Sequence, residues 1–320
     1  MATTTRAPRK PTDSARSRSN TRQPTVGMVG LGIMGSAMAA NLQKAGFRVI
    51  GFDVLAGRRA EHRRHGGQVA ASCRELGRRC RVIICSLPSP GALIETADVL
   101  ASSVREGSVV IETSTLPIGV KEEARARLAG GGAVMLDCPL SGTGAQARVK
   151  DLIVFVSGDR DAARQSAAVF EGFSRAHHYV GRFGAGTKMK FVANLLVAIH
   201  NVAAAEAFVF AMKMGLDAAM VLKVIGDGAG SSRMFQVRGP MMVKGDYSAA
   251  TMKLDVWKKD MTVIADAARD AGAPTPLFAA TAPFYVAATA MCGPDQDTGA
   301  VCAVFEQMAG HTRRRPRKGN

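Results

Sequence analysis

A short apolar run that ends in closely spaced glycines constrains this chain more than any other feature. The run Val26–Val29 leads into Gly30-Leu31-Gly32-Ile33-Met34-Gly35, and a helical pattern covers 34–45. Gly30 permits a tight turn, Gly32 lets a phosphate approach the backbone, and Gly35 lets the helix pack closely on the strand. Because a helix N-terminus attracts anions, the six residues from Gly30 to Gly35 are predicted to bind the pyrophosphate of a dinucleotide.

An acidic residue stands after the next predicted strand, at the spacing such a site requires. Asp53 follows the run 48–52 and lies 18 residues after Gly35, where a carboxylate accepts hydrogen bonds from the hydroxyls of the adenosine ribose. A carboxylate there would repel a 2′-phosphate, so NAD is favoured as the cofactor. Arg58 and Arg59 lie a turn beyond the strand and could reach such a phosphate, so NADP remains a possible cofactor.

The order of the elements predicts an α/β fold followed by an all-helical region. From Val26 to about Val180, β-rich runs alternate with helical segments, which is typical of a parallel sheet covered on both faces. The predicted strands are 25–29, 48–52, 82–85, 109–112, 134–137, 153–157 and 178–180. After Gly186 an Ala-, Met- and Leu-rich helical pattern takes over, beginning with a long helix at about 187–214. We predict a Rossmann-type, doubly wound parallel sheet domain at 25–184 and an all-α substrate and dimerisation domain at 185–310.

The net charge of +16 raises the question of a nucleic-acid partner. Most of this charge lies at the two ends, because residues 1–24 and residues 311–320 each carry a net charge of +5. Both ends lack the apolar residues that build a core, so they are predicted to be disordered basic tails. Charge runs without interleaved aromatic residues are weak indicators of nucleic-acid binding. Contact with nucleic acid is therefore expected, if at all, only through the tails.

Composition disfavours several other classes of protein. No stretch approaches the roughly eighteen uninterrupted apolar residues of a membrane-spanning helix, and the first residues lack the apolar core of a secretory signal. A cytoplasmic location without a membrane partner is expected. The six cysteines show no C-x-x-C spacing, so they are predicted to be reduced and structural. The six histidines suggest no metal constellation, and no metal is predicted.

Two lysines at the start of the long helix are candidates for acid–base chemistry. Oxidation of an alcohol by hydride transfer needs a base for the hydroxyl proton, and a lysine can serve if burial lowers its pKa. Lys188 and Lys190 are two residues apart and therefore lie on nearly opposite sides of a helix, so only one can face the site. Asn194 lies one turn after Lys190 on the same face, where its amide could hold a substrate.

Four blocks carry a resemblance to a known family. The segment Gly30-Leu-Gly-Ile-Met-Gly-Ser-Ala-Met-Ala-Ala-Asn-Leu-Gln-Lys-Ala-Gly46 closely resembles the opening of the β-hydroxyacid dehydrogenases, the family of 3-hydroxyisobutyrate dehydrogenase. Three further blocks follow in the family's order: Asp137-Cys-Pro-Leu-Ser-Gly-Thr-Gly-Ala145, Gly184-Ala-Gly-Thr-Lys-Met-Lys-Phe-Val-Ala-Asn194 and Leu254-Asp-Val-Trp-Lys-Lys-Asp260. The resemblance covers about residues 26–308 and implies a second domain like the C-terminal domain of 6-phosphogluconate dehydrogenase.

The resemblance assigns roles to residues on the substrate side. Its register makes Lys190 the general acid and base, which leaves Lys188 solvated or facing a phosphate. Asn194 and the turn Ser141-Gly142-Thr143 would bind the substrate, and a hydroxyl with exposed backbone N–H groups in a turn makes a suitable anion cradle on physical grounds as well. The family usually has glycine at three nearby positions that are Thr143, Gln146 and Lys150 here. This departure leaves the identity of the substrate open.

The resemblance also assigns residues on the cofactor side. Leu87, Pro88 and Thr115 match positions that touch the cofactor, and Lys259 matches a lysine beside the nicotinamide, with Asp260 as a possible partner. The segment that contains Arg233, Phe235 and Arg238 lines the substrate pocket in relatives. For these three residues, surface or packing roles are favoured.

Together these observations predict an NAD(P)-dependent dehydrogenase or reductase acting on CH–OH groups. The expected reaction moves a hydride between nicotinamide and a small 3-hydroxy acid, or the matching semialdehyde, and relatives suggest a homodimer or homotetramer. One alternative is a related reductase of another anionic aldehyde or a sulfonate, with Thr143 altering the anion pocket. A second alternative is a noncatalytic scaffold whose basic tails associate with nucleic acid. Retention of Lys190 counts against the scaffold, because a chromatin-associated relative of this kind has lost that lysine.

Overall fold

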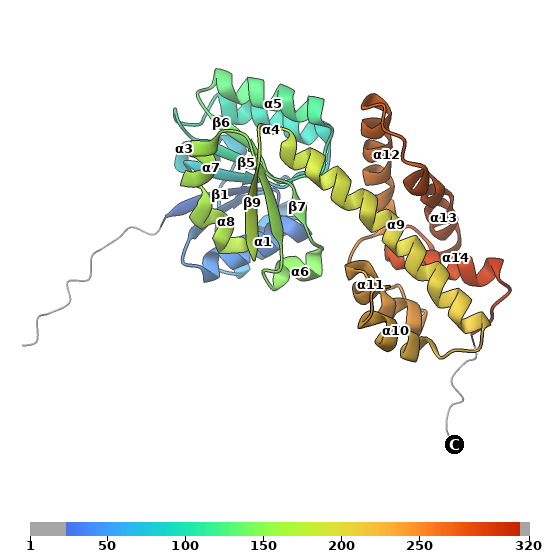
Figure 1. Ribbon diagram of the computed structural model, residues 1–320. Coiled ribbons are helices and arrows are strands. Elements are labelled where there is room, and N and C mark those ends of the chain that lie inside the picture. The colour runs from blue at the N-terminus through green and yellow to red at the C-terminus, as the bar shows by residue number, and fades with distance from the viewer. Residues whose placement is uncertain (1–23, 314–320) are drawn as a thin grey trace, which may run out of the picture.

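In the computed structural model, which describes residues 24–313, one sheet of nine strands forms the first part of the chain (Figure 1). Its strands are β1 (Thr25–Val29), β2 (Arg48–Phe52), β3 (Gln68–Val69), β4 (Val82–Cys85), β5 (Val109–Glu112), β6 (Val134–Asp137), β7 (Leu140–Ser141), β8 (Ile153–Ser157) and β9 (Ala176–Gly181). Six of the seven predicted strands have the predicted bounds, and the seventh extends further at both ends. The very short strands β3 and β7 were not predicted, because two residues leave no periodic pattern to detect.

The strand order is β3-β2-β1-β4-β5-β6-β8-β7, with β9 paired to β8. Neighbouring strands from β3 to β6 in this order are parallel, as predicted. Strand β8 departs from the prediction of a purely parallel sheet, because it runs antiparallel to β6 and β7 and parallel to β9. Since β1 lies beside both β2 and β4, the carboxyl end of β1 is the switch point at which α/β sheets bind ligands.

Helices cover both faces of the sheet. Helices α1 (Ile33–Lys44), α6 (Gly144–Arg148), α7 (Arg160–Gln165) and α8 (Ala167–Phe173) contribute to one hydrophobic core. Helices α3 (Cys73–Arg79), α4 (Pro90–Ala101) and α5 (Ile118–Gly130) contribute to the core on the opposite face. Helix α2 (Ala56–Arg64) follows β2 and precedes β3. Apolar side chains on both sides of each central strand explain why these strands read as continuous apolar runs.

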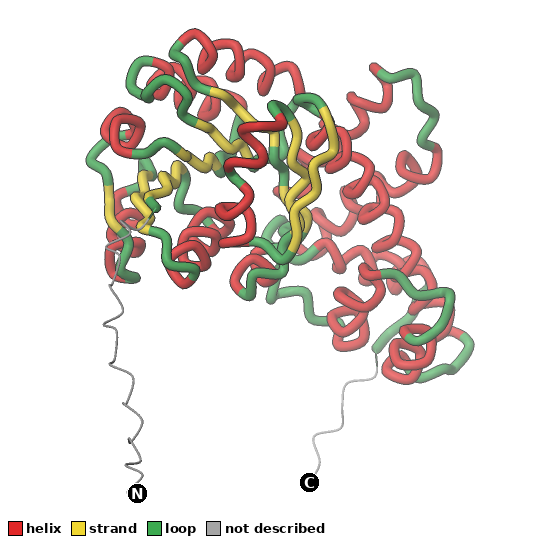
Figure 2. The backbone as a smooth tube through the Cα atoms, turned by 60° about the vertical axis from the view of Figure 1, so that its left-hand side comes forward, coloured by secondary structure: helices red, strands yellow, loops and turns green. Residues whose placement is uncertain are grey.

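The second part of the chain is all-helical, as predicted, and surrounds the long helix α9 (Ala185–Lys213). It continues with α10 (Ala218–Gly226), α11 (Arg233–Lys244), α12 (Leu254–Asp270), α13 (Pro276–Cys292), a 3₁₀ turn η1 (Thr298–Ala300) and α14 (Val301–Met308). Figure 1 shows α9 running from the sheet into the middle of this bundle, and Figure 2 shows the strands gathered in one part of the molecule and helices making up the other. Among the described residues, α9 alone is long and apolar enough to cross a membrane, but it packs against α11, α13 and α14 as a core helix.

The predicted tails lie largely outside the described residues. One correction concerns the second tail, which was predicted to begin at residue 311. Arg313 forms an ion pair with Glu306 and donates a hydrogen bond of 2.7 Å to the backbone oxygen of Val243. Arg313 therefore fastens the chain after α14 to the end of α11 and is engaged within the fold, where it was predicted to belong to a disordered basic tail.

Candidate functional site

The glycine turn after β1 has the tight geometry that the sequence predicts. Gly30 has a φ of +90°, and a Cβ there would lie 2.1 Å from the backbone oxygen of Ser86. A Cβ on Gly35 would lie 1.9 Å from the backbone oxygen of Gly30, so the helix can approach the strand only without a side chain. Helix α1 begins at Gly32 with no side-chain cap, which leaves its first N–H groups available to an anion. These features fit a dinucleotide pyrophosphate.

Asp53 lies beside this turn, but its carboxylate already has partners. One oxygen accepts a hydrogen bond of 2.8 Å from the N–H of Leu31, and the other accepts one of 2.9 Å from the N–H of Leu55. Arg58 approaches the same carboxylate at 3.3 Å, and its guanidinium also stands 3.7 Å from where a Cβ on Gly32 would lie. The carboxylate therefore braces the glycine turn, and only its remaining acceptor capacity is available to a ribose.

Two cavities meet at Lys190. The first, which we call the cofactor-side cavity, has a volume of about 270 Å³ and lies at the carboxyl ends of the strands. It brings together five of the residues predicted to contact the cofactor: Ile33, Met34, Leu87, Thr115 and Lys259. Pro88, Asp53, Leu31 and the three glycines of the turn do not line it. The exposed side chain of Ile33 gives this cavity an apolar wall at the start of α1.

Lys190 is buried on the first turns of α9 and lines this cavity. Burial lowers the pKa of its amine from the usual 10.5, the neighbouring carboxylate of Asp260 opposes that shift, and the charge of Lys259 reinforces it. The net direction is downward, so the neutral amine is more accessible here than in an exposed lysine. A general base needs this property.

Asp260 organises the polar groups around Lys190. It is 3% exposed, and it accepts a hydrogen bond of 3.1 Å from the side-chain amide of Asn194. Lys259 lies 3.2 Å from its other oxygen and donates a hydrogen bond of 2.8 Å to the backbone oxygen of Thr115. The predicted pairing of Lys259 with Asp260 is present. The predicted positions of Asn194 and Lys190 on one helix face also hold, since both are buried and line a common cavity.

A buried network fixes the first turn of α9 on the sheet. Asp137, the last residue of β6, accepts hydrogen bonds from the N–H and the hydroxyl of Thr187 and an ion-pair contact of 2.8 Å from Lys121. Lys121 also contacts Glu112 at 2.6 Å, and all three charged side chains are fully buried. A Cβ on Gly186 would lie 2.7 Å from the backbone oxygen of Asp137. The glycine therefore allows the close approach on which the position of Lys190 depends.

The second cavity, which we call the substrate-side cavity, has a volume of about 200 Å³. The predicted substrate residues Ser141, Gly142, Thr143, Asn194 and Lys190 all line it. It shares four lining residues with the cofactor-side cavity: Gly142, Thr143, Lys190 and Met252. The amine of Lys190 is thus placed where the two cavities adjoin.

Thr143 differs in one respect from its predicted role in an anion cradle. It is the N-cap of α6, and its backbone N–H donates a hydrogen bond of 3.0 Å to the side-chain oxygen of Gln146 in a capping box. This N–H is therefore not free for a substrate, and it is not one of the exposed N–H groups expected of the cradle; the substrate-binding role of Thr143 stays a prediction. The reason lies in the departure from glycine at 143 and 146, since threonine followed three residues later by glutamine forms a capping box.

Sequence reasoning missed or misassigned several residues of the substrate-side cavity. Phe235 packs in the core against Phe208, as favoured, and Arg233 is exposed at the cavity. Arg238 was expected in a surface or packing role, but it is 2% exposed and lines the cavity. Asp151 and the cavity-lining Arg175, which form an ion pair of 2.7 Å, were not singled out. A charged residue in a helix with no local partner gives no signal of burial. The resemblance placed the segment of Arg238 at the substrate pocket, but nothing in the sequence showed that this side chain is buried.

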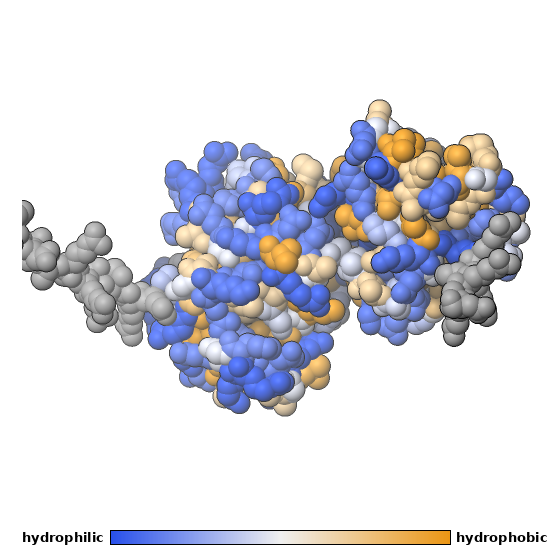
Figure 3. Space-filling model, turned by 90° about the horizontal axis from the view of Figure 1, so that it is seen from below, coloured by the Kyte–Doolittle hydropathy of each residue, from blue (hydrophilic) through white to orange (hydrophobic). Residues whose placement is uncertain are grey.

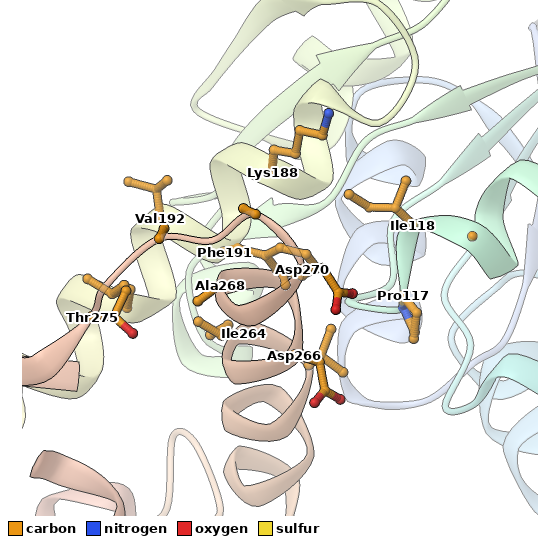
Figure 4. Close-up of a pocket in the computed structure, with 16 residues that line it drawn as sticks. Pro117, Ile118, Lys188, Phe191, Val192, Ile264, Asp266, Ala268, Asp270 and Thr275 are labelled. Atoms are coloured by element: carbon orange, nitrogen blue, oxygen red, sulfur yellow. The ribbon is translucent and has the colours of Figure 1, made fainter. Parts of the chain in front are cut away.

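A groove larger than these two cavities lies elsewhere, between α9, α12 and the start of α5 (Figure 4). Its volume is about 710 Å³, and Lys188, Phe191 and Val192 line it from α9. Lys188 belongs to this groove and Lys190 to the two cavities, which agrees with the prediction that the two lysines point to different sides. The groove wall is mainly apolar, and its two carboxylates, Asp266 and Asp270, form no ion pair with Lys188 within residues 24–313. The groove therefore lacks the paired polar groups found around Lys190.

No cluster of three or more metal-ligating side chains occurs within residues 24–313. All six cysteines lie within this range and are free thiols. Burial raises the pKa of Cys73 to about 11, and that of Cys80 to about 11 as well. These thiols are therefore poor nucleophiles. The groups suited to acid–base chemistry are the polar side chains around Lys190.

Comparison with known families divides the chain at the start of α9. The profile of the NAD-binding domain of 6-phosphogluconate dehydrogenase matches residues 25–181. The profile described as the NAD-binding region of NADP-dependent 3-hydroxyisobutyrate dehydrogenase matches residues 184–305. Together the two matches span nearly all of the described residues.

Individual relatives and solved structures agree with these matches. L-threonate dehydrogenase of Cupriavidus necator is 33% identical over 284 residues, which cover 88% of this chain and 95% of the relative. Glyoxylate/succinic semialdehyde reductase 1 of Arabidopsis thaliana is 31% identical over 239 residues, which cover 74% of this chain and 82% of the relative. The structure of Mycobacterium tuberculosis 3-hydroxyisobutyrate dehydrogenase with L-serine superposes with a TM-score of 0.81 at 29% identity, covering 88% of this chain and 99% of the other.

Proposed function

The chain belongs to the β-hydroxyacid dehydrogenase family and is an NAD(P)-dependent dehydrogenase acting on CH–OH groups, and from this premise we propose that Lys190 is its general acid and base. The proposed substrate is a small hydroxy acid of the 3-hydroxyisobutyrate type, or the matching semialdehyde in the reverse direction. Names of relatives that act on threonate and on succinic semialdehyde support an anionic substrate of this size.

The observation that carries this proposal is the position of one buried amine where two cavities adjoin. Ile33 and Met34, from the glycine turn and the start of α1, line the cofactor-side cavity, and Lys190 lines both this cavity and the substrate-side cavity. A bound nicotinamide supplies the hydride acceptor. In the oxidation, Lys190 takes the hydroxyl proton of the substrate. The carbon that bears this hydroxyl gives up a hydride to that acceptor and becomes a carbonyl carbon. In the reduction, the ammonium of Lys190 returns that proton to the carbonyl oxygen.

The neighbouring side chains give Lys190 its properties. Burial favours the neutral base, while the nearby carboxylate of Asp260 keeps the protonated form within reach for the reverse reaction. The amide of Asn194 is held by Asp260, so its orientation is fixed before a substrate arrives. Ser141 and Gly142 would contact the substrate carboxylate from β7 and the turn that follows it.

The test is the substitution Lys190→Met, with Lys188→Met as its matched control. The first should lower kcat by roughly 10²- to 10⁴-fold while leaving the dissociation constant of the nucleotide nearly unchanged. The second removes an equal charge two residues away, on the side of the large groove, and should leave kcat within about twofold. A panel of hydroxy acids and semialdehydes, followed through the absorbance of reduced nicotinamide, supplies the assay. Full activity of Lys190→Met would refute the assignment.

For the cofactor, we propose a preference for NAD over NADP. The support is the negative charge of Asp53 at the end of β2, where a 2′-phosphate would come close. Arg58 neutralises part of that charge, so the preference should be moderate. The alternative substrates, another anionic aldehyde or a sulfonate, enter the same panel. The scaffold alternative rests on the tails, which lie outside the described residues.

We also propose that the protein forms a homodimer or homotetramer through its helical region. Large apolar side chains are exposed on α9 and α13, among them Val192, Leu196, Phe210, Leu277 and Val286. Apolar residues gather on the helical part in the view of Figure 3, whereas the sheet part there is mostly hydrophilic. Exposed apolar surface of this kind is typical of an interface. Light scattering after gel filtration should give a mass of two or four chains, and a monomer would contradict the proposal.

A further inference from the structure

The substrate-side cavity contains a buried cation that the proposed chemistry does not use. We propose that Arg238 is a specificity-determining residue: it holds an acceptor oxygen at the end of the substrate opposite the carboxylate bound at Ser141. The preferred substrates are then hydroxy acids with an oxygen-bearing tail, and acids with an alkyl tail are disfavoured. This inference rests on the proposed function, because it concerns the substrate of the same site.

The first argument is the hydrogen-bonding balance of Arg238. Its guanidinium has five N–H donors, and its Nε donates a hydrogen bond of 2.9 Å to Asp297. Its Nη1 lies 2.9 Å from the sulfur of Met234, a thioether that accepts hydrogen bonds weakly. Within residues 24–313, neither Nη atom has an oxygen acceptor. Nη2 is not among the fully buried atoms that lack a partner, and the residue lines the cavity, so an occupant of the cavity that offers oxygen can accept a hydrogen bond from it.

The second argument is that Asp297 does not depend on the rest of the guanidinium. The carboxylate also accepts hydrogen bonds from the N–H groups of Gly299, Thr251 and Met252, at 2.9, 2.7 and 3.1 Å. These backbone contacts fasten Asp297 between η1 and the segment before α12. The acid balances the charge of Arg238, so the occupant need not bring a full second charge. Either a hydroxyl or a carboxylate oxygen of the occupant can therefore accept a hydrogen bond from Arg238.

The third argument separates Arg238 from the other arginines of the cavity. Arg175 and Arg233 are exposed, and both approach the same carboxylate, Asp151, at 2.7 and 3.7 Å. Their charges are therefore shared with Asp151 and screened by solvent. Arg238 is 2% exposed, and its contacts hold it in one orientation. A buried, oriented guanidinium discriminates between groups more sharply than a mobile surface one.

The fourth argument is the arrangement of the cavity itself. Ser141 and Gly142 line it from the sheet, Arg238 lines it from α11, and Lys190 and Asn194 line it from α9. A substrate whose carboxylate lies at Ser141 and whose reacting carbon lies at Lys190 directs its remaining end toward the helical region. The other walls there include Val197, Met252 and Trp257. The indole N–H of Trp257 is itself fully buried, so Arg238 is the group on these walls that can donate hydrogen bonds to the tail.

The test compares three substrates with the same carboxylate and the same reacting hydroxyl. They are 3-hydroxypentanoate, which has an alkyl tail, 3,4-dihydroxybutanoate, which replaces its terminal methyl by a hydroxyl, and 3-hydroxypentanedioate, which ends in a second carboxylate. The wild-type enzyme should prefer at least one oxygen-bearing tail over the alkyl tail by tenfold or more in kcat/KM, about what one hydrogen bond to a charged group supplies. The last two substrates show whether a hydroxyl or a carboxylate fits better.

Two variants assign the preference to Arg238. Arg238→Met should lower kcat/KM by about tenfold to a hundredfold for the oxygen-bearing tails and leave the alkyl tail within about twofold. Because this change leaves Asp297 without its counter-charge and could prevent folding, Arg238→Lys serves as the second variant. It keeps a charge near Asp297 but lacks the planar fork, and it should lose most of the preference. Arg233→Met, at the same cavity, should affect all three substrates alike.

A binding measurement keeps this inference distinct from the proposed function. The three acids are titrated into nucleotide-loaded Lys190→Met protein, with and without Arg238→Lys, and their dissociation constants are compared. Tighter binding of the oxygen-bearing tails that is lost with Arg238→Lys supports the inference even if no acid is turned over, an outcome that would refute only the proposed function. Equal binding of all tails, or an equal loss for all tails in Arg238→Lys, would overturn it.

Discussion

The carboxylate of Asp137 accepts hydrogen bonds from both the backbone N–H of Thr187, at 2.8 Å, and its hydroxyl, at 2.7 Å. Asp137 ends β6 and Thr187 lies in the first turn of α9, fifty residues later in the chain. Helix α9 begins at Gly184 with no side-chain cap of its own. A strand of the sheet therefore supplies the capping carboxylate for the helix that carries Lys190, one turn after Thr187.

This relationship predicts that Asp137→Asn affects both stability and turnover. The amide keeps one accepting oxygen, but its NH2 group must face donors that now bind the second oxygen of Asp137, and the negative charge beside Lys121 is lost. The free energy of unfolding should fall by about 3 kcal/mol. The start of α9 should shift, and kcat should fall by roughly tenfold or more, because positioning errors near 1 Å are costly. Thr187→Val removes one hydrogen bond at nearly the same volume and should cost only about 1–2 kcal/mol. Urea unfolding and steady-state kinetics measure both, and equal losses in the two variants would argue against the cap.

Asp260→Asn should move the pH dependence of catalysis to lower pH. The carboxylate of Asp260 raises the pKa of Lys190 against the larger effect of burial, so its removal lowers that pKa further. Oxidation uses the neutral amine, which is present above the pKa of Lys190. The rise of kcat/KM for oxidation should therefore occur at lower pH in the variant, and the fall in the reductive direction should shift the same way. Wild-type profiles should have their inflection below 10.5. A shift to higher pH in the variant would contradict the pairing.

The elements that follow a local pattern could be predicted from the sequence. The strand from Thr25 to Val29 and the glycine turn after it lie where their pattern places them, because periodicity and glycine spacing are local signals. The contacts that define the candidate site are not local. Asp137 and Thr187 are fifty residues apart, and Arg238 and Asp297 are 59 apart. One sequence does not reveal which of many possible partners such a charge will meet, so these pairs became visible only in the fold.

Lys150 provides a prediction about stability that is independent of the active site. It is exposed, follows the last turn of α6, and has a φ of +62°, in the left-handed region that favours glycine. Side chains are strained there by roughly 1–2 kcal/mol. Lys150→Gly should raise the free energy of unfolding by about 1 kcal/mol, and Lys150→Ala, which keeps a Cβ, should not. Thermal and urea unfolding can detect this difference, and a gain of the same size from alanine would point to the lost charge as the cause.

The cofactor preference can be tested without disturbing the glycine turn. Asp53 does two things: it accepts a hydrogen bond from the N–H of Leu31, and it places a negative charge near Arg58. Asp53→Asn retains an acceptor for Leu31 but removes the charge, which frees Arg58 to meet a 2′-phosphate. The ratio of kcat/KM with NAD to that with NADP should fall by about tenfold, the scale of one charge interaction near the surface.

Arg58→Ala should move the ratio in the opposite direction, because the carboxylate of Asp53 then repels a 2′-phosphate with no cation beside it. Dissociation constants of the two dinucleotides, measured by titration, distinguish binding from turnover. A wild-type enzyme that already prefers NADP, with Arg58→Ala abolishing that preference, would mean that Arg58 decides the cofactor. In that case the charge of Asp53 serves mainly to hold the guanidinium of Arg58 over Gly32.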